Sequence, residues 1–135
     1  MLGRPVSVLL VDDSPRFLRL AASILSRRYP TQISVVGTAR TGAEAVQRVA
    51  ELRPDAVLLD VGLGAENGLD LIPRLRGAPG PVVVMLTVHD SPSYAAASMA
   101  AGADGYVPKA RMSSELWPAL ERALESRLSD AGDRE

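Results

Sequence analysis

The chain has 135 residues, a length that suits one domain, and its 15 basic and 16 acidic side chains give a net charge of −1. This balance lacks the charge excess that marks nucleic-acid and membrane surfaces. The basic residues are 14 arginines and one lysine, Lys109; there is one histidine, His89, and no cysteine. The composition therefore excludes disulfide scaffolds, cysteine-ligated zinc and cysteine nucleophiles. It directs any metal site toward oxygen ligands and a hard ion such as Mg²⁺.

The ends of the chain carry no targeting pattern. No apolar run approaches the roughly 18 residues of a membrane span, and Met1–Pro5 does not begin a secretory signal. We therefore expect a cytoplasmic protein. No shift in composition divides the chain, so we expect a single domain over residues 5–128 and a polar, frayed tail over residues 129–135.

Five short apolar runs predict β-strands. They are nearly continuous rather than alternating, which indicates strands buried on both faces, as in a parallel sheet covered by helices. The predicted strands are Val6–Val11, Ile33–Val36, Ala56–Leu59, Val82–Leu86 and Gly105–Val107.

Segments with helical periodicity lie between and after these runs. Hydroxyl residues predict three helix starts, at Ser14, Thr41 and Ser91. Pro73 predicts a short third helix, and Pro118 is expected near the first turn of the last one. Five strands alternating with five helices predict an open α/β sandwich with helices on both faces. The expected buried positions are Phe17, Leu20, Ala21, Ile24 and Leu25 in the first helix, Ala43, Val46, Val49 and Ala50 in the second, and Leu116, Leu120, Leu124 and Leu128 in the last.

Polar residues follow four of the five predicted strands. Asp12 and Asp13 end the first strand, Asp60 the third, Thr87 the fourth and Lys109 the fifth. Ligands of open parallel sheets bind beyond the carboxyl ends of the strands, so these side chains are expected at one edge. Three clustered carboxylates repel one another unless a cation lies among them. A Mg²⁺ ion would relieve that repulsion and leave room for a phosphoryl group near the ammonium and the hydroxyl.

Each of these residues also has an ordinary structural explanation. An aspartate after a strand often caps a helix, a threonine favours strands, and a lysine is commonly a solvated loop charge. The set as a whole favours a functional site, because four strand ends would otherwise carry it by chance.

Four segments, in this order and spacing, resemble the bacterial response-regulator receiver domain of two-component signalling over residues 5–128. They are Val8–Ser14, Pro54–Asp60 with Gly68 eight residues later, Met85–Thr87 and Ala101–Lys109. The resemblance implies a flavodoxin-like (βα)5 three-layer sandwich with a five-stranded parallel sheet in the order 2-1-3-4-5. The stretch from Thr87 through Lys109 is most similar to receivers of LuxR/NarL-type regulators.

The resemblance implies a mechanism for the strand-end residues. Asp60 would accept a phosphoryl group from a phosphohistidine on a sensor histidine kinase or phosphotransfer protein. Asp12, Asp13, Asp60 and the backbone carbonyl of Gly62 would hold Mg²⁺, and Lys109 would neutralise charge on the phosphoryl oxygens.

The resemblance also implies a switch. The Thr87 hydroxyl would move to the phosphoryl oxygen and Tyr106 would turn inward. This would alter the surface formed by the fourth helix, the fifth strand and the last helix. That surface is a candidate homodimer contact. The chain would catalyse only its own phosphorylation and dephosphorylation, without turnover and without direct nucleic-acid binding.

The sequence departs from the family pattern at Leu63 and Gly64, where Met-Pro is common, so the loop after Asp60 is expected to be looser. His89 is expected to be solvated, although its place near the rim leaves a role in hydrolysis open. Trp117 either packs against the fifth strand or contacts a partner. The length leaves no room for an output domain, so we expect a single-domain regulator or an excised receiver.

Three other classes of protein share parts of this pattern. A phosphorylation-independent adaptor of the same fold would not need the intact set of acids, threonine and lysine. A haloacid-dehalogenase hydrolase requires an Asp-x-Asp motif after the first strand, whereas Ser14 stands two residues after Asp12. A flavodoxin requires a glycine- and hydroxyl-rich phosphate loop at that place.

Overall fold

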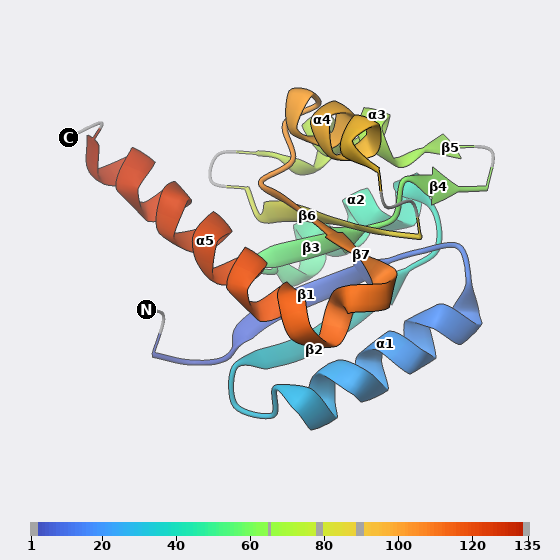
Figure 1. Cartoon of the computed structure of the whole chain (residues 1–135), viewed down its shortest axis with the longest axis horizontal. Coiled ribbons are helices and arrows are strands. Elements are labelled where there is room, and N and C mark those ends of the chain that lie inside the picture. Colours follow the sequence, from blue (N-terminus) through green and yellow to red (C-terminus); the bar gives the residue numbers. More distant parts are fainter. Residues whose placement is uncertain (1–2, 65, 78–79, 89–90, 134–135) are drawn as a thin grey trace.

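A five-stranded parallel sheet forms the centre of the protein (Figure 1). The computed structural model describes residues 3–64, 66–77, 80–88 and 91–133. The sheet order is β2-β1-β3-β6-β7, which confirms the predicted order 2-1-3-4-5 when the strands of this sheet are counted along the chain. The strands are β1 (Val6–Val11), β2 (Ile33–Ala39), β3 (Ala56–Leu59), β6 (Val82–Thr87) and β7 (Gly105–Pro108).

Helices cover both faces of the sheet, as predicted. Residues of α1 and α5 pack in one apolar cluster, and residues of α2 and α3 pack in a second one. The helices are α1 (Pro15–Arg28), α2 (Gly42–Leu52), α3 (Gly68–Leu75), α4 (Pro92–Ala100) and α5 (Met112–Asp133), with the 3-10 turn η1 (Lys109–Arg111) before α5. A pair of two-residue strands, β4 (Gly62–Leu63) and β5 (Glu66–Asn67), forms an antiparallel hairpin that the sequence analysis did not predict.

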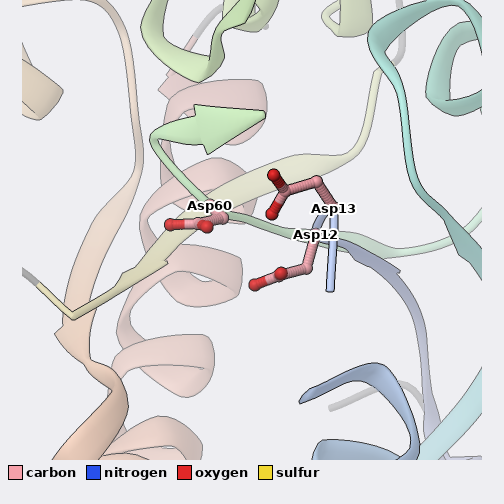
Figure 2. A group of neighbouring side chains, drawn as sticks. All are labelled: Asp12, Asp13 and Asp60. Atoms are coloured by element: carbon pink, nitrogen blue, oxygen red, sulfur yellow. The ribbon is translucent and has the colours of Figure 1, made fainter. Parts of the chain in front are cut away.

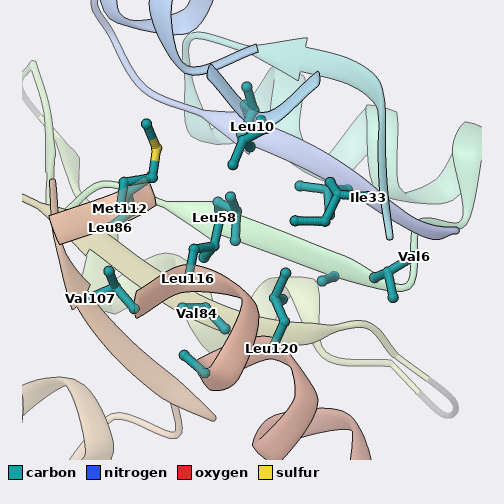
Figure 3. Packing of buried hydrophobic residues seen from close by; sticks show 14 of the residues in the cluster. Val6, Leu10, Ile33, Leu58, Val84, Leu86, Val107, Met112, Leu116 and Leu120 are labelled. Atoms are coloured by element: carbon teal, nitrogen blue, oxygen red, sulfur yellow. The ribbon is translucent and has the colours of Figure 1, made fainter. Parts of the chain in front are cut away.

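The two clusters are built from alternate residues of the same strands. In β1, Leu10 packs with α1 and α5, whereas its neighbour Leu9 packs on the opposite face. Figure 3 shows the first cluster, in which Leu58 of β3 and Val84 of β6 lie close to Leu116 of α5. Both faces of the central strands β1, β3 and β6 are therefore almost fully buried, which explains why the sequences of these strands do not alternate.

The predicted helix starts are confirmed by their side-chain caps. The Ser14 Oγ accepts a hydrogen bond of 3.2 Å from the Phe17 N–H, and the Ser91 Oγ accepts one of 3.3 Å from the Tyr94 N–H. The Thr41 Oγ1 caps α2 in the same way. Pro118 lies further inside α5 than expected, because the helix already begins at Met112.

Several positions expected in the core are exposed. Leu20 is 54% exposed, because the α1 face that packs on the sheet centres on Leu18, Ala21 and Leu25. Leu128 is 57% exposed although Leu120, two turns earlier, is fully buried. Figure 1 shows the reason for this: α5 runs on past the sheet. The helix continues to Asp133, through residues that were expected in a frayed tail.

In α2, too, the buried face includes fewer residues than the sequence predicted. In α2, Gly42 and Ala45 are buried, and Val46 and Val49 pack partly against the core. Ala43 and Ala50, which were expected in the core, are exposed.

Trp117 packs inside this chain. Its ring is half-buried against the first cluster, with its centroid 6.4 Å from that of Tyr29. The Tyr29 hydroxyl also donates a hydrogen bond to the Ser113 carbonyl. Tyr29 therefore links the end of α1 to the start of α5. No helix of the described residues is long and apolar enough to cross a membrane.

Asp55 joins the amino ends of β1 and β3. Its carboxylate accepts hydrogen bonds from the Ser7 N–H and Oγ, at 2.9 and 3.0 Å, and pairs with the exposed Arg4 guanidinium at 2.7 Å. Burial opposes ionisation of this carboxyl, but the hydrogen bonds from Arg4 and Ser7 outweigh it and hold the pKa of Asp55 below its ordinary value.

Replacing Asp55 with alanine is expected to lower the free energy of unfolding at pH 7 by about 2 kcal/mol, because both Ser7 donors lose their acceptor. A carboxyl whose pKa is lowered on folding stabilises the fold above its unfolded pKa, and this is lost as the pH falls through the folded pKa. Urea unfolding of both proteins at pH 7 and at about pH 3 measures the difference, which is expected to shrink in acid. Arg4→Ala is the control, and we expect a much smaller effect because Arg4 is exposed. A wild-type advantage that does not change with pH would contradict the assignment.

Candidate functional site

The backbone brings two of the predicted acids to one edge of the sheet. The Asp12 N–H donates to the Ala39 carbonyl of β2, and the Asp60 N–H donates to the Val11 carbonyl of β1, both at 3.0 Å. These bonds continue the strand ladders by one residue. The positions of both aspartates are therefore set by backbone hydrogen bonds at the ends of buried strands.

Asp12, Asp13 and Asp60 point toward a shared space, as Figure 2 shows. One carboxylate oxygen from each lies within 4.8 Å of the others. Asp12 is buried at 2% exposure, Asp60 is half-buried and Asp13 is exposed. The cluster thus has a fixed floor and an open side.

Lys109 brings the cation of the predicted set to the same place. Its Nζ is 2.6 Å from the Asp12 Oδ2 and 3.6 Å from the Asp60 Oδ2. The other oxygen of Asp12, Oδ1, accepts a 2.9 Å hydrogen bond from the Ser14 N–H. Both oxygens of the buried carboxylate are therefore satisfied, and the ammonium lies closer to Asp12 than to Asp60.

Asp60 is the acid whose ionised form is disfavoured here. Burial raises the pKa of its carboxyl and the neighbouring Asp12 raises it further, whereas the Lys109 charge and the Gly62 N–H act in the opposite direction. The net effect is a raised pKa. One ammonium therefore does not compensate fully for the burial and repulsion of this group.

This donor set fits a small divalent cation. Three carboxylates within reach of one point supply the oxygen ligands that Mg²⁺ prefers, and the open side leaves room for water or a ligand oxygen. The raised pKa of Asp60 indicates that additional positive charge would be favourable at this place. Among the described residues, this cluster is the one group of acids, cysteines and histidines arranged to hold a metal ion.

The loop after Asp60 folds as the β4–β5 hairpin. Gly64 has a φ of +63°, a conformation that proline cannot adopt, so the departure from the Met-Pro pattern of the family accompanies a different backbone. Glu66 fixes the hairpin to the start of α2, since its Oε1 accepts a 2.9 Å hydrogen bond from the Gly42 N–H. A glycine one residue past Leu63 was the available sequence signal for this turn.

Gly68 allows the loop to close over the end of β3 at Asp60. Its N–H donates a 2.6 Å hydrogen bond to the Val61 carbonyl. A Cβ at this position would overlap the carbonyl oxygen of Asp60 and lie 3.0 Å from the Val61 Cα. The glycine is therefore needed for the close approach of two backbone segments.

Thr87, Tyr106, Gly62 and His89 are the remaining residues that the sequence analysis singled out. Thr87 is fully buried at the end of β6 and is paired in register with Pro108, next to Lys109. Tyr106 of β7 is half-buried and packs partly against the second apolar cluster. Gly62 is exposed at the start of β4, and His89 lies outside the described residues.

Comparisons with known proteins agree with this arrangement. The model of the response regulator receiver domain family matches residues 8–121. The chain is 41% identical over 108 residues to a protein-glutamate methylesterase/protein-glutamine glutaminase of Geobacillus kaustophilus, covering 78% of this chain and 30% of that protein. It is 36% identical over 125 residues to the transcriptional regulatory protein KdpE of Mycobacterium tuberculosis, covering 92% of this chain and 53% of that protein. The chain thus spans about a third and about half of the length of these two relatives.

Solved structures of response regulators are also similar to this chain. A two-component response regulator of the LuxR family from Aurantimonas sp. has a TM-score of 0.80 and 29% identity, covering 90% of this chain and 86% of that one. The receiver domain of the putative response regulator NarL from Mycobacterium tuberculosis has a TM-score of 0.71 and 25% identity, covering 96% and 98%. The chain belongs to the response regulator receiver domain family and has its flavodoxin-like fold, as the sequence resemblance predicted.

Proposed function

We propose that this receiver domain accepts a phosphoryl group on Asp60 from a sensor histidine kinase or phosphotransfer protein, in a reaction that depends on Mg²⁺. The observation that carries the proposal is the position of Asp60. Its carboxylate lies 3.6 Å from the Lys109 ammonium and within reach of Asp12 and Asp13. A nucleophilic carboxylate between a cation and a pair of metal-ligating acids is the arrangement that phosphoryl transfer requires.

In the proposed reaction, an Asp60 carboxylate oxygen attacks the phosphorus of the donor. A new P–O bond forms as the P–N bond to the donor histidine breaks, and the departing nitrogen retains the bond electrons and takes a proton. The product is an aspartyl phosphate. Its hydrolysis breaks the new P–O bond, returns the carboxylate and inorganic phosphate, and resets Asp60 for another transfer.

Each strand-end residue has a defined role in this scheme, and Asp60 serves both as nucleophile and as a metal ligand. Asp12, Asp13, Asp60 and the Gly62 carbonyl would hold Mg²⁺, which supplies positive charge next to the transferring phosphoryl oxygens. Lys109 shifts from Asp12 toward a phosphoryl oxygen and neutralises a further part of the negative charge on the phosphoryl oxygens. The buried Thr87 donates its hydroxyl to a phosphoryl oxygen, and Tyr106 turns further inward, which carries the change to the surface of α4, β7 and α5.

Incubation with Mg²⁺ and acetyl phosphate is expected to add about 80 Da to the wild-type chain, the mass of a phosphoryl group on an acyl phosphate. The adduct should be stable in acid and labile in base, and peptide mapping should place it on Asp60. Asp60→Asn is expected to abolish it, because an amide oxygen is a poor nucleophile and forms no stable acyl phosphate. Intact-mass spectrometry measures both results.

Asp70→Asn is the matched control, since Asp70 is an exposed carboxylate on α3 that is not a member of the cluster. This variant is expected to form the adduct as the wild type does, and chelation of Mg²⁺ with EDTA is expected to prevent it in both. A wild-type chain that forms no adduct, or an Asp60→Asn chain that still does, would exclude the proposal.

Phosphorylation is expected to promote self-association through α4, β7 and α5. The helix α4 has no charged residue, and its Met99 is 51% exposed, so the α4 part of this surface can pack against a second copy without desolvating charge. Size-exclusion chromatography with and without acetyl phosphate measures the change, with Met99→Glu as the variant that should remain monomeric. An elution volume that does not respond to phosphorylation would remove the dimer from the scheme.

A further inference from the structure

The ammonium of Lys109 has a third neighbour besides the two carboxylates. Its Nζ lies 3.9 Å from the centroid of the Phe17 ring, well within the range of about 6 Å for cation–π attraction. The contact joins the only lysine of the chain to its only phenylalanine. Sequence periodicity assigned Phe17 to the core face of α1, and in the structure the ring is half-buried against the first cluster.

The backbone holds Phe17 in a fixed relation to the acids. Its N–H donates to the Ser14 Oγ, and the Ser14 N–H in turn donates to the Asp12 Oδ1. Lys109 closes this chain of contacts, because it is bound to the other oxygen of Asp12. The aromatic face is therefore positioned by the same short segment that positions the buried acid.

We propose that Phe17 is a positioning residue that keeps the Lys109 ammonium next to Asp60 while its anionic partner changes. The inference rests on the proposed phosphoryl transfer to Asp60. Before transfer the ammonium pairs most closely with Asp12, at 2.6 Å, and after transfer it must pair with a phosphoryl oxygen on Asp60.

An aromatic face suits this task because it attracts a cation over the whole face of the ring, whereas a hydrogen-bond acceptor attracts it along the direction of a lone pair. The ammonium can move along the ring while it leaves one carboxylate and approaches another oxygen, without losing this contact. The lysine stem alone is flexible and would not limit the ammonium to that path. A leucine would fill a similar volume in the core without supplying a negative face.

Two kinds of measurement test the proposal. Since lysine and phenylalanine each occur once, selective ¹³C labelling gives one set of signals for each. A nuclear Overhauser effect is expected between the ring protons and the ε-methylene of Lys109. The upfield ring-current shift of that methylene should disappear in Phe17→Leu and Phe17→Met and persist in Phe17→Tyr.

The second measurement is the rate of adduct formation with acetyl phosphate. Phe17→Leu and Phe17→Met are expected to lower the maximal rate about tenfold, within the range of a desolvated cation–π contact. The donor and Mg²⁺ concentrations at half-saturation should stay within about twofold, and Phe17→Tyr should restore the wild-type rate. Two ringless variants are used so that one result stands if the other fails to fold.

The outcomes separate this inference from the function on which it rests. A wild-type chain that forms no adduct removes the proposed function, and the inference with it, even if the nuclear Overhauser effect is present. A wild-type chain that reacts while the folded ringless variants react equally fast overturns only the role of Phe17. Phe17→Tyr as slow as Phe17→Leu would do the same, because it would reduce the residue to a packing role.

Discussion

Replacing Lys109 with arginine or with methionine is expected to leave the chain folded and to slow phosphorylation of Asp60 by a factor of about 10² to 10³. Methionine removes the charge that lies next to Asp12 and Asp60 and that would face the phosphoryl oxygens. Arginine keeps the charge but spreads it over a wider, planar group, which cannot take the place of the compact ammonium 2.6 Å from the Asp12 oxygen and 3.6 Å from Asp60 without rearrangement. In a chain with 14 arginines, this is the position at which arginine is expected to fail.

The adduct rate and the far-ultraviolet circular dichroism of each variant measure the two parts of this prediction. Arg111→Met is the control, since it removes an exposed cation from the same 3-10 turn, where Arg111 pairs with Glu115. Its rate is expected to match the wild type. If both Lys109 variants lose their helical signal, the ammonium has a structural role, and if both react at the wild-type rate, it does not act on the phosphoryl group.

Replacing Gly68 with alanine is expected to lower the free energy of unfolding by about 3 kcal/mol. The added methyl group would overlap the Asp60 carbonyl oxygen and press on the Val61 Cα, and both are backbone atoms that cannot rotate away. Relief requires the hairpin loop to move outward, which shifts the main chain at Asp60, the proposed phosphoacceptor. We therefore expect phosphorylation to fall together with stability.

Gly62→Ala is a matched control within the same loop. A Cβ there meets no atom within 4 Å, and its φ is not positive, so the change in stability should be within about 0.5 kcal/mol. Urea unfolding of the two variants measures the contrast. Equal stability of the two variants would mean that the loop yields easily at Gly68 and that the close approach does not hold Asp60 in place.

The strands were predictable because burial on both faces leaves a continuous apolar run. Ala56–Leu59 matches the observed β3 at both ends. The edge strand β2 extends beyond its apolar run to Ala39, and its register shifts opposite Val8 and Leu9, so that Val36 is an extra residue. An edge strand tolerates such irregularity because one side has no partner, and hydropathy alone does not register it.

Helix positions were less predictable at the margins of the buried face. Leu20 fits a spacing of three and four from its neighbours, but each residue turns the helix by about 100°, and Leu18 fits the sheet better. Leu128 lies on the apolar side of α5, as its spacing predicts, but it is exposed because the sheet ends before this part of the helix. Periodicity predicts which side of a helix is apolar, whereas the extent of burial depends on the length of its neighbours.

The sequence predicted which residues form the site, but not how their side chains pair. The rule for the carboxyl ends of parallel strands brought Asp12, Asp60 and Lys109 together from three separate motifs. It did not predict that Lys109 lies closer to Asp12 than to Asp60, because that choice depends on side-chain torsions and on the Ser14 N–H that holds Asp12. The Phe17 ring was missed for the same reason, since a half-buried aromatic on a helix resembles any other core residue in sequence.

The contact between Lys109 and Asp12 joins positions 97 residues apart, so it also bears on the folding of the chain. Lys109 follows β7, an edge strand that pairs with β6 alone in the sheet. In a partly folded form that lacks β7, the acids after β1 and β3 would be assembled without their ammonium, and their repulsion would raise the free energy of that form. Docking of β7 relieves this repulsion. Lys109, the residue proposed to contact the phosphoryl group, is therefore also expected to make folding more cooperative, because intermediates without the last strand are disfavoured.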